Sequence, residues 1–125
     1  MDKPAKDVLR FIERRIDTVP DIEALLLLWD DRPRTFTLGE IATRIFVSDA
    51  AATRILKGLQ QKGLVTTDGE PPTYRYDPAW DSKGELMPRV AETYRRHLIQ
   101  VTSLIHSKAS PGVREFARAF EPKKE

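Results

Sequence analysis

Two neighbouring helix signals, separated by a short turn, most strongly limit what this chain can fold into. Thr37 followed three residues later by Glu40 has the form of a capping box, so we expect a helix to begin directly after Thr37. Ser48 is a good N-cap for a second helix over residues 49–62, and Gly63 is suited to end it in a left-handed conformation. The pattern therefore predicts a helix-turn-helix.

The residue pattern changes after Gly63 from a helical to an alternating one. Residues 64–67 and 73–76 are rich in Thr, Val and Tyr and predict two strands, while residues 68–72 have the composition of a turn. A hairpin directly after a helix-turn-helix is typical of a winged helix-turn-helix. We therefore expect a mainly α fold with one small β-hairpin, in which residues 20–77 form the winged helix domain.

Helical periodicity also precedes this unit. Residues 1–19 contain an amphipathic pattern that predicts a helix over residues 7–17. Pro20 suits the first turn of the next helix, because a residue there has no intrahelical partner for its N–H. The leucines at 25–28 make that helix apolar nearly all round, so we expect it to be the most buried one.

A polar connector over residues 77–84 leads to a C-terminal helical segment, residues 85–121. An apolar stripe predicts one continuous helix over residues 85–107, about 35 Å long, and Ser110 followed by Pro111 predicts a last short helix. Because a winged helix of this size covers less length than that, we expect part of the stripe to meet a partner. The alternative is that the helices over residues 7–17 and 85–107 pack on each other within one monomer. The stripe consists of Leu86, Val90, Tyr94, Leu98, Val101 and Ile105.

Composition favours a single non-enzymatic domain. The chain has 125 residues, enough for one compact domain, and no cysteine, which excludes a disulfide scaffold and a thiolate metal site. Its two histidines, His97 and His106, are nine residues apart on one expected helix and so lie on opposite faces, where they cannot share a metal. The sequence shows no phosphate loop and no carboxylate–histidine cluster. We expect no catalytic residues, metal or cofactor.

Hydropathy gives no sign of a membrane segment. The chain has no run near the roughly 18–20 apolar residues that a spanning helix needs. Its first residues are charged and are not followed by an apolar stretch, so they do not resemble a secretory signal. We therefore expect a cytoplasmic protein.

The stretch TLGEIATRIFVSDAAATRILKGLQQKGLVTT resembles the winged helices of the MarR family and related bacterial regulators. The resemblance covers about residues 21–76. It implies a transcription regulator that binds double-stranded DNA and a homodimer built by the terminal helices. It also implies that a small-molecule effector of unknown identity binds between the winged helix and the dimer helices, with Tyr94 and His97 as candidates for lining that space.

A helical wheel identifies the side of residues 49–62 that is available to DNA. At about 100° per residue, the apolar residues of this helix fall on one side, while Arg54 and Lys57 fall on the other. Arg54 is suited to a guanine edge or a phosphate, and Lys57 to a phosphate. The alternative is that both cations are ordinary solvated positions. The expected DNA-binding residues are Thr37, Ser48, Ala50, Thr53, Arg54, Lys57, Gln61 and Arg75.

The net charge of +2 is unevenly distributed. Residues 37–64 hold four Lys or Arg against two Asp or Glu, residues 65–85 hold two against five, and residues 86–125 hold eight against four. Asp68 and Glu70 at the wing tip would be repelled by phosphates, so we expect the tip to stay clear of DNA, with Arg75 as the wing's useful cation. A second hypothesis remains open: a winged-helix adaptor that binds a protein partner and no DNA.

Overall fold

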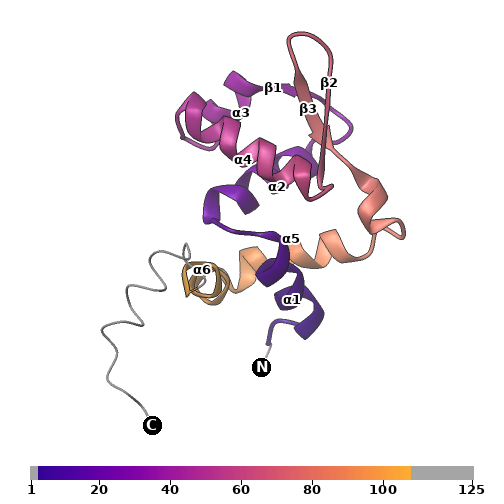
Figure 1. The fold of residues 1–125 in the computed structure, drawn as a ribbon. Coiled ribbons are helices and arrows are strands. Elements are labelled where there is room, and N and C mark those ends of the chain that lie inside the picture. The colour runs from indigo at the N-terminus through magenta and orange to yellow at the C-terminus, as the bar shows by residue number, and fades with distance from the viewer. Residues whose placement is uncertain (1–2, 108–125) are drawn as a thin grey trace.

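The computed structural model describes residues 3–107 and arranges them as a helical body with a small antiparallel sheet at one end (Figure 1). The helix expected after Ser110 lies outside these residues. The elements, in chain order, are α1 (Lys6–Arg15), α2 (Val19–Asp30), β1 (Phe36–Thr37), α3 (Leu38–Arg44), α4 (Asp49–Gln61), β2 (Val65–Asp68), β3 (Thr73–Tyr76), the 3₁₀ helix η1 (Pro78–Asp81), α5 (Leu86–Arg96) and α6 (Leu98–Ser107). Among the described helices, none is long and apolar enough to cross a membrane.

Local capping explains where the helices of the helix-turn-helix begin. The Thr37 hydroxyl accepts a hydrogen bond from the Glu40 N–H at 3.1 Å, and the Glu40 carboxylate accepts one from the Thr37 N–H at 2.9 Å. The Ser48 hydroxyl accepts from the Ala51 N–H at 3.1 Å, and Gly63 has a φ of 77°. The capping box, the second N-cap and the glycine stop predicted from the sequence are therefore confirmed.

The sheet has one strand more than the predicted hairpin. Its strand order is β1-β3-β2, and β1 pairs with β3 so that Phe36 lies opposite Tyr74. A strand of two residues is too short to show an alternating pattern, which is why the sequence did not reveal it. The pairing buries the Phe36 side chain completely and places the start of α3 directly at the edge of the sheet.

The core forms around α2, as its leucine-rich sequence predicts. Ile22, Leu25 and Leu28 of this helix are fully buried. α2 packs against α4 and β3, whereas α1 packs against α5 and α6. The helix-turn-helix and the terminal helices thus share one continuous hydrophobic cluster, which includes Val8, Ile12, Ile41, Leu56, Leu59, Val90, Val101 and Ile105.

The prediction of a single helix over residues 85–107 is wrong, because the structure has two helices there. The backbone leaves the helical region at His97, with φ −127° and ψ 46°, so α5 ends at Arg96 and α6 begins at Leu98. The change of direction lets α6 pack against α1 and α2, which buries Val101 and Ile105. Leu98, placed in the apolar stripe by the continuous-helix prediction, is instead 47% exposed. The two histidines also no longer share one helix, so the wheel argument about them does not apply.

Candidate nucleic-acid interface

The face of α4 opposite the core is fully available to a ligand. Ala52, Leu56 and Leu59 are buried against the domain. The remaining face carries small and cationic side chains, as predicted, and every member is exposed: Ala50, Thr53, Arg54, Lys57 and Gln61. A major groove about 12 Å wide admits one helix, and this face presents two cations among small and polar side chains.

Two residues predicted to contact DNA, Thr37 and Ser48, act as helix caps in the structure. Each hydroxyl oxygen accepts a backbone N–H, and each residue is exposed at the start of α3 or α4. A hydroxyl has one donor in addition to its acceptor sites, so capping leaves both O–H groups able to donate to a phosphate oxygen. Thr53 differs, because its hydroxyl already donates to the Asp49 carbonyl at 2.9 Å.

A reciprocal clasp fixes the C-terminal end of α4 to α1. The Arg15 guanidinium donates to the Lys62 carbonyl at 3.1 Å, and the Lys62 ammonium donates to the Arg15 carbonyl at 3.0 Å. Lys62 also forms an ion pair with Asp17 at 2.8 Å. Each cation thus sits at the negative end of the other residue's helix. Lys62 counts toward the positive charge of the helix-turn-helix in the sequence, but here it holds the scaffold.

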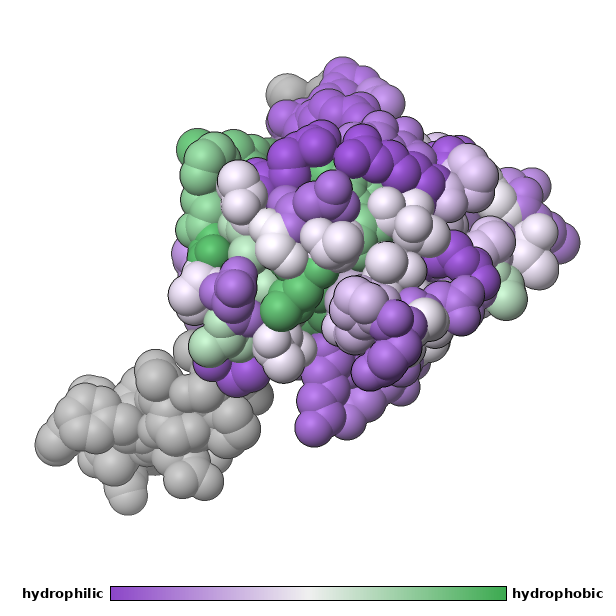
Figure 2. Space-filling view, turned by 90° about the horizontal axis from the view of Figure 1, so that it is seen from above, coloured by the Kyte–Doolittle hydropathy of each residue, from purple (hydrophilic) through white to green (hydrophobic). Residues whose placement is uncertain are grey.

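The wing has a different charge from α4. Asp68 and Glu70 are exposed at its tip, as the sequence predicts. Arg75 lies opposite Thr66 in β3 and is half-buried, so it is part of the sheet and not of the tip. The structure therefore brings the predicted residues of α4 together on one surface and leaves Arg75 on another element. Seen from above, the surface of the molecule is mostly hydrophilic, with hydrophobic residues along its left edge and in the middle of the face (Figure 2).

Two arginines beside α3 form a cluster that sequence reasoning missed. The guanidinium carbon of Arg34 lies 4.3 Å from the Phe36 ring centroid, and that of Arg44 lies 5.8 Å from it. Both approach the same oxygen of Asp31, at 3.6 Å and 3.9 Å respectively. Arg34 is three residues from Asp31, a weak local signal, whereas nothing in the sequence links Arg44 to either residue. We call Asp31, Arg34, Phe36 and Arg44 the arginine cluster.

Aromatic stacking joins the base of the wing to the N-terminal helix. The Trp80 ring of η1 stacks on Phe11 of α1 with 4.9 Å between centroids, and its edge meets Tyr76 of β3 at 6.3 Å. Burial raises the pKa of Tyr76 to about 12. The Asp81 carboxylate then accepts the first N–H groups of α5, from Leu86 at 3.0 Å and Met87 at 2.8 Å. The connector expected to be merely polar is therefore an ordered joint.

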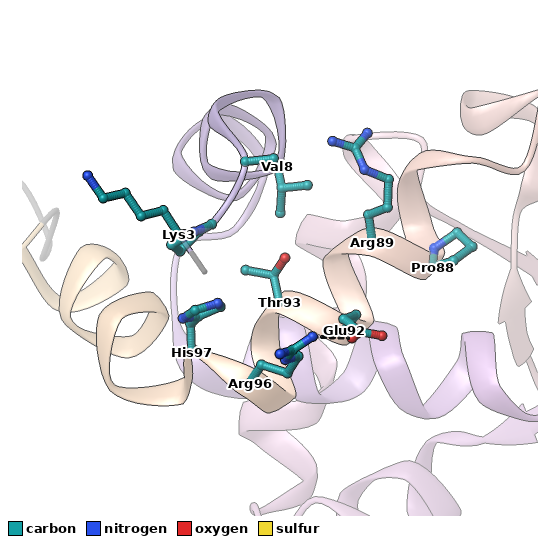
Figure 3. A pocket seen from close by; sticks show the side chains of 10 residues that line it. Lys3, Val8, Pro88, Arg89, Glu92, Thr93, Arg96 and His97 are labelled. Carbon is teal, nitrogen blue, oxygen red and sulfur yellow. Dashed lines mark hydrogen bonds and ion pairs between the residues drawn. The ribbon is translucent and has the colours of Figure 1, made fainter. Parts of the chain in front are cut away.

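The two residues expected to line an effector space lie apart. His97 lines a pocket between the N-terminal segment and α5, together with Lys3 and Val8 (Figure 3). Tyr94 does not line it; its hydroxyl donates to the Glu23 carboxylate of α2 at 2.5 Å. Burial, together with this carboxylate, raises the pKa of Tyr94. The geometry therefore does not assign Tyr94 and His97 to one ligand.

The cations of that pocket are largely neutralised by neighbouring carboxylates. Arg89 donates to both oxygens of Asp7, at 2.8 Å and 2.7 Å, and holds the pKa of that carboxyl below its ordinary value. Arg96 forms an ion pair with Glu92 at 3.2 Å. These contacts hold α1 against α5 and stabilise individual helix turns. Within the described residues, no group of three or more His, Cys, Asp or Glu is placed to hold a metal ion.

Comparison with known proteins identifies the same unit. A model of the MarR family matches residues 18–67, from the cap of α2 into the first strand of the wing. RV1404 from Mycobacterium tuberculosis is 16% identical, with 100% of this chain and 99% of that chain covered and a TM-score of 0.54. MepR, a transcription regulator of the Staphylococcus aureus multidrug efflux pump MepA, is 15% identical, with 91% and 82% covered and a TM-score of 0.51.

A third solved structure agrees with these two. A MarR family protein from Bacillus stearothermophilus is 16% identical, with 91% of this chain and 77% of that chain covered and a TM-score of 0.50. Among curated proteins no match was found. At such low identity the solved structures establish the fold alone. The resemblance to the MarR family is thus confirmed over residues 18–67, and the chain has the winged-helix fold of MarR-type structures.

Proposed function

We propose that the protein is a transcription regulator that recognises DNA sequence by placing α4 in the major groove. The family match supports a DNA-binding regulator, and no enzyme, at the level of the family. The observation that carries the proposal is the exposed face of α4, where two cations stand among small and polar residues and no ion pair occupies Arg54 or Lys57 in the described structure.

Each residue of this surface has a role suited to its place. Ala50 in the first turn of α4 allows the helix to approach the base edges closely. Arg54 is the candidate for a guanine edge, because its fork of donors matches the two acceptors of guanine, while Lys57 and Gln61 reach a phosphate or a neighbouring base. The hydroxyls of Thr37 and Ser48 donate hydrogen bonds to phosphate oxygens of the DNA backbone. Thr53 adds a methyl contact, and Arg75 meets a flanking phosphate from the wing.

We further propose a homodimer built by the terminal helices, residues 85–121 included. Ile99 is 78% exposed and stands beside the half-exposed Leu98 at the start of α6, so this turn presents apolar surface to the solvent. A two-fold dimer would place two copies of α4 about one DNA turn, roughly 34–36 Å, apart. The solution mass measured by light scattering tests this, and a monomer at all concentrations would contradict it.

The groove assignment is tested with a variant that removes both cations of α4. A preferred duplex is first selected from a random pool with the unmodified protein, and affinity is then measured by fluorescence anisotropy. We expect Arg54→Ala with Lys57→Ala to reduce the preference for that duplex over a random one by at least tenfold, because a good base contact contributes about 1–3 kcal/mol of discrimination. The matched control is Arg10→Ala with Arg14→Ala, which removes two exposed arginines that belong to α1 and not to α4.

The same measurement decides between the two functions. Unchanged preference in the α4 variant, with intact folding by circular dichroism, would refute the groove assignment. The adaptor hypothesis is favoured by the wing-tip carboxylates Asp68 and Glu70, which disfavour phosphate contact. It predicts no retention of the unmodified protein on duplex DNA even at low salt.

A further inference from the structure

We propose that Arg34 and Arg44 form a second DNA contact, a clamp for backbone phosphates on the outer side of α3. The inference rests on the proposed function and extends it, because it assigns the backbone contact to this clamp and not to the wing tip. Its ligand is a phosphodiester of duplex DNA beside the groove that α4 enters. The proposal follows from the geometry of the arginine cluster and from its position on the helix-turn-helix.

The arginine cluster has cationic donors to spare. Arg34 and Arg44 share one carboxylate, Asp31, so the three charged groups carry a net charge of +1. The nitrogen–oxygen distances of 3.6 Å and 3.9 Å exceed the roughly 2.7–2.9 Å of a strong charge-assisted hydrogen bond. Within residues 3–107 neither guanidinium donates a side-chain hydrogen bond. Both side chains are about half exposed, at 50% and 49%.

The cluster is also held in place before any ligand arrives. Both guanidiniums lie against the ring of Phe36, which is fully buried and fixed by the pairing of β1 with β3. Stacking of this kind limits the rotamers of the two arginines, so less conformational entropy is lost when they bind. A planar guanidinium matches two oxygens of a phosphate, which a lysine does not.

The position of the cluster matches the part of a helix-turn-helix that crosses the DNA backbone. In such motifs the first helix lies over the phosphates while the second enters the groove. α3 is that first helix: its buried side carries Ile41 and Ala42, and its outer side carries Arg44. A hollow on the outer side is lined by Arg34, Thr37, Gly39, Glu40, Thr43 and Arg44.

One carboxylate in this hollow opposes phosphate binding. Glu40 is exposed there, but its carboxylate is engaged by the Thr37 N–H in the capping box. The Thr37 hydroxyl beside it retains a donor for the same phosphate. The two guanidiniums are thus balanced by two carboxylates, Asp31 and Glu40, so this site is formally neutral and keeps the Thr37 hydroxyl as a further donor, whereas the wing tip carries the exposed carboxylates Asp68 and Glu70. Electrostatics favours the backbone at α3.

The test is the salt dependence of binding to a random duplex of about 25 base pairs, in which sequence preference plays no part. Arg34→Gln with Arg44→Gln removes both charges and replaces each guanidinium with a neutral planar amide on a shorter side chain. Each phosphate contact adds about 0.9 to the magnitude of the negative slope of log K against log salt. We therefore expect the magnitude of the slope to decrease by about 1.8 in this variant. The matched control, Arg10→Gln with Arg14→Gln on α1, should leave the slope unchanged.

A second pair of variants tests the clamp without touching the arginines. Asp31→Asn removes the carboxylate that competes for both guanidiniums, and Asp30→Asn removes a neighbouring exposed carboxylate that forms no ion pair with either of them within the described residues. We expect Asp31→Asn to tighten binding to the random duplex more than Asp30→Asn does. Equal effects of the two would contradict the clamp.

The outcomes separate this inference from the proposed function. Failure of the unmodified protein to bind duplex DNA at low salt would overturn the proposed function, and the clamp with it. Binding by the unmodified protein with an unchanged slope in the Arg34 and Arg44 variant would overturn the clamp alone. We expect that variant to show a shallower slope of log K against log salt. It should still prefer the selected duplex over a random one, because phosphate contacts carry no sequence information.

Discussion

Phe46 occupies a position in the helix-turn-helix where its conformation costs stability. Its φ is +61°, and it is the one described residue other than glycine with a positive φ. The Val47 N–H donates to the Ala42 carbonyl at 3.0 Å and the Phe46 N–H to the Thr43 carbonyl at 3.3 Å, which is the Schellman pattern that ends a helix. Glycine is the usual residue at this point, because a Cβ there is strained. The side chain is also 92% exposed, so it gains almost nothing from burial.

The stability effect of Phe46→Gly follows from these two facts. Relief of the left-handed conformation is worth about 1–2 kcal/mol. The greater freedom of glycine in the unfolded chain offsets about 0.5–1 kcal/mol of that. We expect a net increase of about 0.5–1 kcal/mol in the free energy of unfolding, equivalent to a rise in Tm of roughly 2–6 °C for a domain of this size. Loss of the exposed ring contributes little.

Urea unfolding followed by circular dichroism measures the change, at one protein concentration because a dimer's stability depends on it. The m-value should stay constant while the midpoint rises. Phe46→Ala is the control, because it removes the ring but keeps the Cβ, and it should not be stabilised. A Phe46→Gly protein that is no more stable than the Phe46→Ala protein would refute the reasoning that strain, and not ring exposure, sets the cost.

Other perturbations test the scaffold that holds the interface. Lys62→Met breaks the clasp between α4 and α1 and should lower the free energy of unfolding by about 1–2 kcal/mol. The control Lys57→Met, on the exposed face of the same helix, should change the free energy of unfolding by less than about 0.5 kcal/mol. Equal losses of stability in urea unfolding would contradict the clasp. The raised pKa values of Tyr94 and Tyr76 mean that the unfolded chain releases its tyrosine protons first. The contribution of these two tyrosines to the free energy of unfolding is therefore complete below about pH 10 and declines as the pH rises above it. Tyr94→Phe should make the loss of stability at alkaline pH, measured by thermal unfolding, less steep. Asp7 behaves in the opposite sense: because its pKa is lowered by Arg89, its contribution is present above about pH 4 and is lost on acidification, and Asp7→Asn should remove that part of the acid dependence.

Features set by neighbouring residues in the chain were predictable. The starts of α3 and α4 depend on Thr37, Glu40 and Ser48, each of which bonds to a backbone group three residues away. The exposed face of α4 follows from the period of the helix alone. This is why the sequence predicted the helix-turn-helix and the grouping of Arg54 with Lys57, although whether these residues contact DNA stays a prediction.

Features set by distant residues were not predictable. β1 exists only because Phe36 meets Tyr74 from the hairpin. The break at His97 exists because α6 packs back on α1 and α2, and a periodic apolar stripe continues through such a break without a sign of it. The Arg15–Lys62 clasp joins residues 47 positions apart. In each case local preference permitted several outcomes and tertiary packing selected one.

These distant contacts determine how rigidly α4 is presented. Its N-terminal end is capped by Ser48, and its C-terminal end is bonded to the end of α1 through Arg15 and Lys62. α1 is in turn bonded to α5 by the paired hydrogen bonds of Arg89 with Asp7. The exposed face of α4 is therefore connected to the terminal helices by a short series of charge-assisted contacts, each of which fixes a helix end or a helix pair. Because α4 is bonded to α1 at its C-terminal end, we expect its affinity for DNA to depend also on residues of α1 and α5 that do not touch the DNA.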